Sequence, residues 1–71
     1  MTLNEIVCAI NELSLEELRE DCHTPGTFAY RVSAATQRYH ELLDESKEYG
    51  WVGVGCIAYA EAMLDQEGYT L

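Results

Sequence analysis

The segment from Thr27 to Gly50 limits the possible folds of this chain more than any other, because it carries the longest regular apolar pattern. Mostly apolar side chains recur along it at alternating steps of four and three residues: Phe28, Val32, Ala35, Tyr39, Leu42, Ser46 and Tyr49. Steps of this kind place side chains on one face of an α-helix. The pattern therefore predicts a long central helix over about residues 27–49, roughly 35 Å in length.

The two ends of this central helix carry recognisable signals. Gly50 directly follows the last residue of the pattern and is the expected helix stop. At the other end, the helix can begin with Thr24 as its cap and Pro25 in its first turn. Gly26 and Thr27 supply an alternative, later start.

Two shorter helices are predicted ahead of the central helix. Thr2 with Glu5, and Ser14 with Glu17, have the spacing of a capping box, which is typical of a helix start. The second box predicts a break at Ser14 and a second helix over about residues 15–22, with one longer helix bent at Ser14 as the alternative. The side chains expected to face the core are Leu3, Ile6, Val7, Ile10, Leu13, Leu15, Leu18 and Cys22.

The stretch from Trp51 to Leu64 is the most apolar part of the chain. Its Trp, Val, Ile and Tyr residues favour strands, and its glycines weaken a helix. A single strand has no obvious partner in this chain, however, so we predict a helix from about Val52 to Gln66 that ends at Gly68. The core side of this helix would carry Ile57, Ala60, Met63 and Leu64. A second side, small enough to let another backbone such as that of the central helix approach closely, would carry Gly53, Gly55, Ala58 and Ala62.

These helices together predict an all-α fold in a single domain over residues 1–71. The expected architecture is a small bundle of three to four helices, in which the long central helix forms an antiparallel hairpin with the C-terminal helix. The short N-terminal pair would pack across this hairpin. A chain of 71 residues buries only about 60% of the surface of its unfolded form, so a disulfide, a metal or a second copy is expected to add support.

The cysteines and the N-terminal residues indicate in which cellular compartment the protein is expected. Cys8, Cys22 and Cys56 are odd in number and form no CxxC pair, so neither a secretory disulfide framework nor a zinc motif is visible. The N-terminus has no basic flank, and no apolar run approaches the roughly 18 residues of a membrane span. We therefore expect a cytoplasmic protein that needs no cofactor.

Two constellations of reactive side chains are candidates for chemistry. A metal site would have to combine Cys22 and His23 with Cys8, Cys56 or His40. Adjacent residues on a helix point about 100° apart, which disfavours joint ligation by the first two. Nucleophilic catalysis would have to use a set such as Cys22 with His40 and Glu41, a combination of common residue types. The chain also lacks a glycine-rich phosphate loop and a nucleophile elbow, so we predict a protein that is not an enzyme.

The charge imbalance is the clearest functional signal. Thirteen acidic residues against four basic ones give a formal net charge of −9. Such a chain repels phosphate and acidic lipid at long range, so we expect no direct binding of nucleic acid or membrane. A basic surface of another protein is the expected partner. The alternative is that the charge only keeps a small protein in solution.

The chain also has more aromatic residues than the central helix pattern uses. Tyr30, Tyr59, Tyr69 and Trp51 are additional to it. Tyrosine and tryptophan are frequent in protein interfaces because they offer rigid area with a polar tip, and they can equally complete a small core. We expect both uses, with Trp51 inside the core.

The predicted function is therefore a non-enzymatic binding module that inhibits or regulates a partner. Its partner-binding residues are predicted to be Glu12, Glu16, Glu17, Glu20, Asp21, Tyr30, Glu61 and Asp65. Carboxylates on rigid helices can imitate the spacing of phosphates in a nucleic acid, or can form an acidic face without such mimicry. Small acidic helical proteins occur among phage and plasmid accessory proteins, a class that no motif of this chain specifies.

The alternative function is structural. In it, the chain associates with further copies of itself through the apolar face of the central helix. The residues predicted for this contact are Val32, Tyr39, Leu42 and Tyr49. A homodimer is also compatible with the first function, since an acidic binding protein can have two-fold symmetry.

Overall fold

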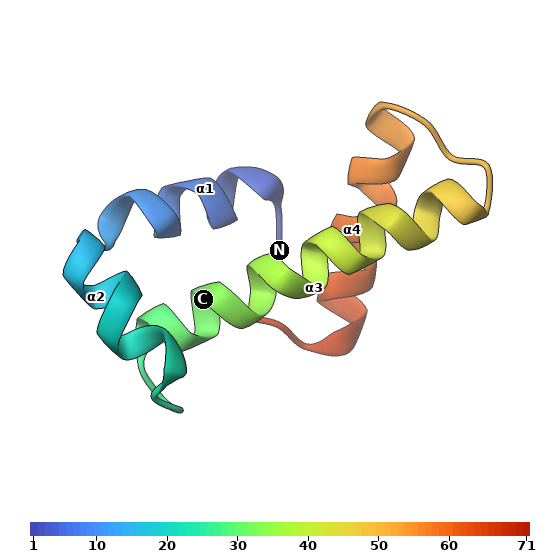
Figure 1. Cartoon of the computed structure of the whole chain (residues 1–71). Coiled ribbons are helices and arrows are strands. Elements are labelled where there is room, and N and C mark those ends of the chain that lie inside the picture. The colour runs from blue at the N-terminus through green and yellow to red at the C-terminus, as the bar shows by residue number, and fades with distance from the viewer.

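The computed structural model describes residues 1–71 and contains only helices. In chain order these are α1 (Leu3–Glu12), α2 (Leu15–Glu20), a short 3-10 helix η1 (Asp21–His23), α3 (Phe28–Glu48) and α4 (Val54–Glu67). The predicted all-α fold is confirmed. The molecule is elongated, with principal extents of 38 × 19 × 16 Å, and α1 and α2 lie at the opposite end from the loop that joins α3 to α4 (Figure 1).

α3 is the predicted central helix, with nearly the predicted bounds. The later of its two candidate starts is the observed one, since the Thr27 hydroxyl accepts a hydrogen bond from the Tyr30 amide at 3.1 Å. The same hydroxyl donates toward the carbonyl oxygens of Asp21 at 2.7 Å and Thr24 at 2.9 Å. Thr27 therefore joins the start of α3 to η1.

The predicted apolar face of α3 is buried over its middle part. The fully covered residues are Val32, Ala35, Tyr39, Leu42 and Ser46. Ser46 is accommodated there because its hydroxyl donates to the Leu43 carbonyl at 2.7 Å. Phe28 at one end of this face is only half-buried, and Tyr49 at the other end is exposed.

The N-terminal pair of helices follows the two predicted starts. The Thr2 hydroxyl accepts from the Glu5 amide at 3.2 Å, and the Ser14 hydroxyl accepts from the Glu17 amide at 3.1 Å. The chain is extended at Ser14, so the predicted break between α1 and α2 is confirmed. α2 ends two residues earlier than predicted, at Glu20, and continues as η1.

α4 turns back along α3 after the loop, as predicted for an antiparallel hairpin. Gly50 and Gly53 have positive φ values of 87° and 58°, which other residues adopt at a cost, and they reverse the chain direction. α4 begins at Val54, two residues later than predicted, and Gly68 ends it in the left-handed conformation with φ of 82°.

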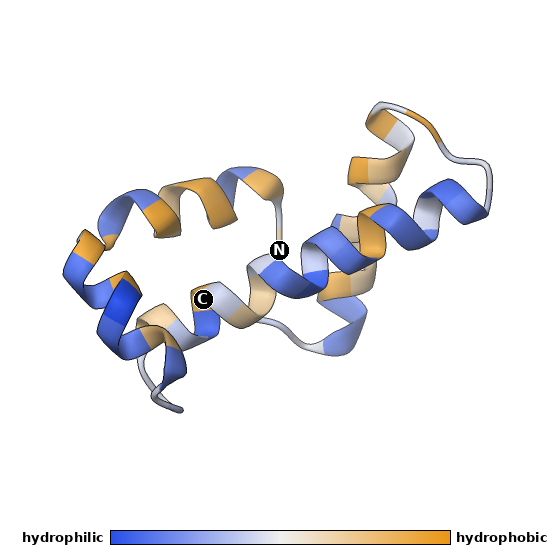
Figure 2. Cartoon of the chain, in the orientation of Figure 1, coloured by the Kyte–Doolittle hydropathy of each residue, from blue (hydrophilic) through white to orange (hydrophobic).

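The core lies where α1, α3 and α4 meet. Its seven buried residues are Met1, Ile6, Ala35, Tyr39, Leu42, Ala60 and Leu64. Tyr69 and Leu71 pack against this cluster, so the C-terminal tail returns to the core. Apolar segments appear along α1, α4 and the α3–α4 loop, whereas the C-terminal half of α3 is mostly hydrophilic (Figure 2).

Three side chains predicted to be inside are largely exposed. Val7 is 46% exposed because it lies at the edge of the α1 face that meets the core. Leu15 is 64% exposed, since it opens a six-residue helix that has no buried residue. Trp51 is 51% exposed because the loop between Gly50 and Gly53 carries it away from the core.

The central helix does not pack on the small residues of α4, which was the one contact named for them. Gly53, Ala58 and Ala62 are exposed, and α3 does not approach them. α4 instead buries Cys56, Ala60 and Leu64, which are spaced by four residues along one side of the helix. Gly55 is approached closely only by the indole of Trp51, with Cε3 at 2.8 Å from the position that a Cβ would take.

Candidate protein-binding surfaces

Five of the predicted partner-binding acids gather where α1 turns into α2. We call this surface the acidic corner, and its members are Glu12, Glu16, Glu17, Glu20 and Asp21. Four of them are exposed and Asp21 is half-buried. None forms an ion pair within the chain, and the only hydroxyl that donates to one of these side chains is that of Ser14, at 3.2 Å from a Glu17 carboxylate oxygen.

Helix stability accounts for only part of the acidic corner. Glu16 and Glu17 lie in the first turn of α2, where a carboxylate interacts favourably with the helix dipole. Glu12 is the last residue of α1, where the same dipole disfavours negative charge, and Glu20 lies at the junction of α2 with η1. The helix dipole therefore does not explain the carboxylate of Glu12.

Glu61 and Asp65 lie apart from the acidic corner. The Glu61 carboxylate accepts a hydrogen bond from the Leu3 amide at 2.6 Å, and the Asp65 carboxylate pairs with the amino group of Met1. Both acids therefore serve the start of α1, whose free amides attract negative charge. The ten residues of α1, roughly 15 Å along its axis, separate this pair from the acidic corner. The structure thus does not bring the eight predicted residues together.

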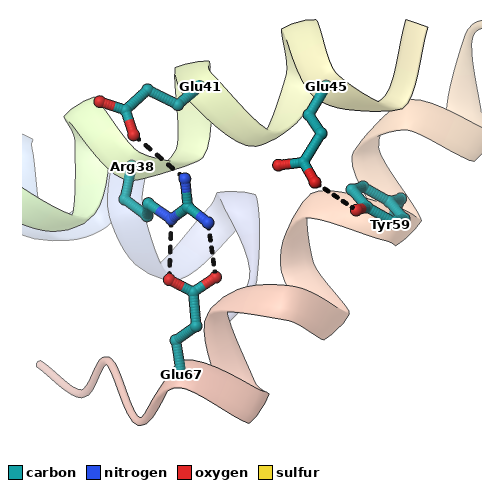
Figure 3. Close-up of polar contacts among 5 residues, drawn as sticks. All are labelled: Arg38, Glu41, Glu45, Tyr59 and Glu67. Carbon is teal, nitrogen blue, oxygen red and sulfur yellow. Dashed lines mark hydrogen bonds and ion pairs between the residues drawn. The ribbon is translucent and has the colours of Figure 1, made fainter. Parts of the chain in front are cut away.

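Three further acids have polar partners within the chain: Arg38 pairs with two of them, and a tyrosine hydroxyl donates to the third. The Arg38 Nε and Nη2 atoms donate to the two carboxylate oxygens of Glu67 at 2.7 and 3.0 Å, and its Nη1 donates to Glu41 at 3.1 Å (Figure 3). The Tyr59 hydroxyl donates to Glu45 at 3.2 Å, again between α4 and α3 (Figure 3). The Arg38–Glu41 contact is the expected pair one helical turn apart.

These contacts shift the ionisation of the groups that make them. The hydrogen bonds from Arg38, followed by its charge, lower the pKa of the Glu67 carboxyl. The hydrogen bonds to Glu67 and then Glu41 raise the pKa of the Arg38 guanidinium. Partial burial, and after it the negative charge of Glu45, raises the pKa of the Tyr59 hydroxyl. Each shift favours the state that holds α3 against α4.

Tyr30, the aromatic member of the predicted partner-binding set, lies beside η1. It is exposed on the first turns of α3 and lines a shallow groove of about 290 Å³ together with Cys22 and His23. Asp21 precedes these two residues in η1. Tyr30 therefore borders the acidic corner.

The residues predicted for self-association are mostly occupied within the chain. Val32, Tyr39 and Leu42 are buried by the other helices, and burial is also the main cause of the raised pKa of the Tyr39 hydroxyl. Only Tyr49 is exposed. A second copy would reach the first three residues only if the helices of the bundle separated.

Four of the seven exposed large apolar side chains lie around the α3–α4 turn, a surface that the sequence pattern did not predict. It consists of Tyr49, Trp51, Val52 and Val54, which are 66%, 51%, 81% and 80% exposed, and we call it the hairpin tip. The signal was the pair of glycines at Gly50 and Gly53, which favour a reversal of the chain rather than the start of a helix. The turn leaves at least half of each of these side chains in water.

The reactive side chains do not assemble into a catalytic set. Cys22 and His40 line the same apolar groove of about 380 Å³ between α1, α2, η1 and α3, but Glu41 is not among the residues of that groove. The Glu41 carboxylate instead accepts a hydrogen bond from Arg38.

Two further findings concern metal ions and membranes. No three histidine, cysteine, aspartate or glutamate side chains lie close enough together to hold a metal ion. None of the helices combines the length and the apolar character that a membrane span requires.

Comparison of the chain with known protein families, with curated proteins and with solved structures gives no match in any of the three.

Proposed function

We propose that this chain is a non-enzymatic binding module that docks its acidic corner on a basic surface of another protein and so inhibits or regulates that protein. The proposal rests on one observation: some acidic side chains have a partner within the chain, and those of the acidic corner have no basic one. The carboxylates of Glu61, Asp65 and Glu67 each have a partner within the chain. Those of the acidic corner have no basic partner, and Glu12 lies at the end of α1, where the helix dipole disfavours negative charge.

The surroundings of the acidic corner also support docking on a protein. Tyr30 and the groove beside η1 supply an amphipathic aromatic side chain next to the charges. Interfaces of this kind combine charge complementarity, which speeds association, with aromatic contact area, which supplies affinity. The partner expected is therefore a basic protein surface with an apolar strip.

A pair of matched double variants tests the proposal. Glu16→Gln with Glu20→Gln removes two charges one turn apart on α2. Asp44→Asn with Glu48→Gln removes two exposed, unpaired charges at the same spacing on α3. Both double variants change the net charge equally. Immobilised chain would be incubated with a cell lysate and washed with NaCl from about 0.1 to 1 M, over which the screening length falls from about 10 to 3 Å.

We expect proteins to be retained at low salt, to be released as salt rises, and to be lost with the α2 variant but not with the α3 variant. Retention that is indifferent to salt, or that falls equally with both variants, would count against docking by the acidic corner. Failure to retain any protein would do the same.

Mimicry of nucleic acid is a narrower form of this proposal. In it, the carboxylates of the acidic corner occupy a groove that otherwise binds phosphates. Duplex DNA would then displace the chain from its partner in a competition assay. A partner that binds DNA and this chain at the same time would exclude mimicry and leave the broader proposal in place.

A further inference from the structure

The hairpin tip is an apolar surface that the proposed function does not use. From Tyr49 to Ala60 the chain has no charged residue. Four apolar side chains in this stretch are at least half exposed, and they follow one another closely around the turn. Their exposed fractions correspond to roughly 450 Å² of side-chain area, within the range of about 300 to 600 Å² in which the largest patch of a monomer is often functional.

We propose that the hairpin tip is a contact surface for a second copy of this chain, in a two-fold symmetric dimer joined tip to tip. In such a dimer the same patch meets itself, so no separate complement is required. Two tips would remove roughly 900 Å² from water, close to the roughly 1,000 Å² of a specific interface. We therefore expect weak association, with a dissociation constant in the roughly micromolar range.

The distribution of charge favours this arrangement over others. The acidic corner lies at the opposite end of a molecule that is 38 Å long, so a contact between tips keeps the two acidic corners several screening lengths apart (Figure 1). Contact between the sides of two chains of charge −9 would bring those charges together.

The thin core gives a second reason to expect a second copy. Four of the eleven buried apolar residues are alanines, and all three cysteines are free. A chain of 71 residues with so little buried volume commonly gains support from oligomerisation. Covering the tip also shields Val52 and the part of Trp51 that α4 leaves in water.

Sedimentation equilibrium with two matched variants tests this proposal. Val52→Lys places a charge in the tip, and Val7→Lys makes the same change at a position on α1 that is 46% exposed and belongs to neither surface. Both variants reduce the net negative charge equally, so general repulsion cannot explain a difference. The protein would be measured from about 5 to 500 μM.

For the unaltered chain and Val7→Lys, we expect the average mass to rise with concentration toward twice the 8.0 kDa of one chain. Val52→Lys should remain monomeric with an unchanged circular dichroism spectrum. Emission of Trp51 should shift to shorter wavelength as the unaltered chain associates, because the indole loses water contact. Apolar association should persist at about 1 M NaCl, unlike the salt-sensitive docking of the acidic corner, so the two proposals can fail separately.

Three outcomes would overturn the tip-to-tip dimer. The first is an unaltered chain that stays monomeric up to about 500 μM. The second is equal association of Val52→Lys and Val7→Lys, which would place the contact elsewhere. The third is a monomer whose Trp51 emission shifts only on addition of zwitterionic lipid vesicles, which would assign the tip to a lipid surface.

Discussion

The indole of Trp51 lies directly over Gly55, in the first turn of α4. A methyl group at position 55 would lie 2.8 Å from the indole Cε3 atom, which is shorter than any normal contact. The absence of a side chain at Gly55 therefore allows the indole to rest on the helix. This contact shields part of Trp51 and shapes the hairpin tip, while its other face stays in water.

Gly55→Ala is expected to displace the indole without unfolding the chain. The new methyl group occupies the space of the ring, whereas alanine is favoured over glycine within a helix by about 1 kcal/mol. Because Trp51 is the only tryptophan, its fluorescence reports the change directly. We expect emission at longer wavelength and stronger quenching by acrylamide, with the helical circular dichroism retained.

Gly53→Ala is the matched control for that substitution. Position 53 has open space around it, but its φ of 58° with ψ of −126° is a combination that essentially only glycine adopts, so the cost is backbone strain of about 1 to 3 kcal/mol rather than a clash. The free energy of unfolding should fall, while the Trp51 emission of the folded state stays near that of the unaltered chain. The reverse pattern of the two variants would contradict the observed position of the indole.

A matched pair of leucine truncations tests the position of the core. Leu42 is completely buried and Leu15 is 64% exposed. Leu42→Ala should lower the free energy of unfolding by about 2 to 5 kcal/mol, because it leaves a cavity. Leu15→Ala should change it by less than about 0.5 kcal/mol. Urea titration followed by circular dichroism measures both, and equal losses would show that the core lies elsewhere.

The ion pair of Arg38 and Glu67 should make stability depend on pH in a defined direction. Arg38 lowers the pKa of Glu67 in the folded state, so this carboxyl contributes stability at pH values above its unfolded pKa. That contribution is lost as the pH falls through the lower, folded pKa. Glu67→Gln should therefore be less stable than the unaltered chain at neutral pH. This difference in stability should disappear as the pH falls below about 4.

Glu48→Gln provides the control for this pH dependence. It removes the same charge from an exposed residue without an ion-pair partner, so it reports the general relief of repulsion in a chain of charge −9. Thermal unfolding from about pH 3 to pH 7 compares the two variants. If Glu67→Gln were less stable than the unaltered chain by the same amount at every pH in this range, the charge of the ion pair would not be the source of the stability.

Thr27 should prove more important than an ordinary surface threonine. Its hydroxyl both caps α3 and holds η1, so Thr27→Ala should cost about 1 to 2 kcal/mol in the free energy of unfolding. Thr27→Ser keeps the hydroxyl and should recover most of this loss. Thermal unfolding of the two variants distinguishes the effect of the hydroxyl hydrogen bonds from the effect of the methyl group. If both variants were equally destabilised, the hydroxyl would not be the cause of the loss.

The features that the sequence predicted well depend on residues close to one another in the chain. The caps at Thr2, Ser14 and Thr27 each involve an amide three residues later. The periodic pattern of α3 and the stops at Gly50 and Gly68 are likewise local. Interactions over three or four residues follow from helix geometry, so the helices and their order follow from the sequence alone.

Tertiary structure alone decided which charges are free and which apolar side chains are covered. Glu61 meets an amide 58 residues away, and Arg38 meets Glu67 at a separation of 29 residues. The chain determined by itself that it forms an all-α hairpin with an excess of acid. How the helices cross depends on packing across the whole core, and only that packing left the acidic corner and the hairpin tip in water at opposite ends of the molecule.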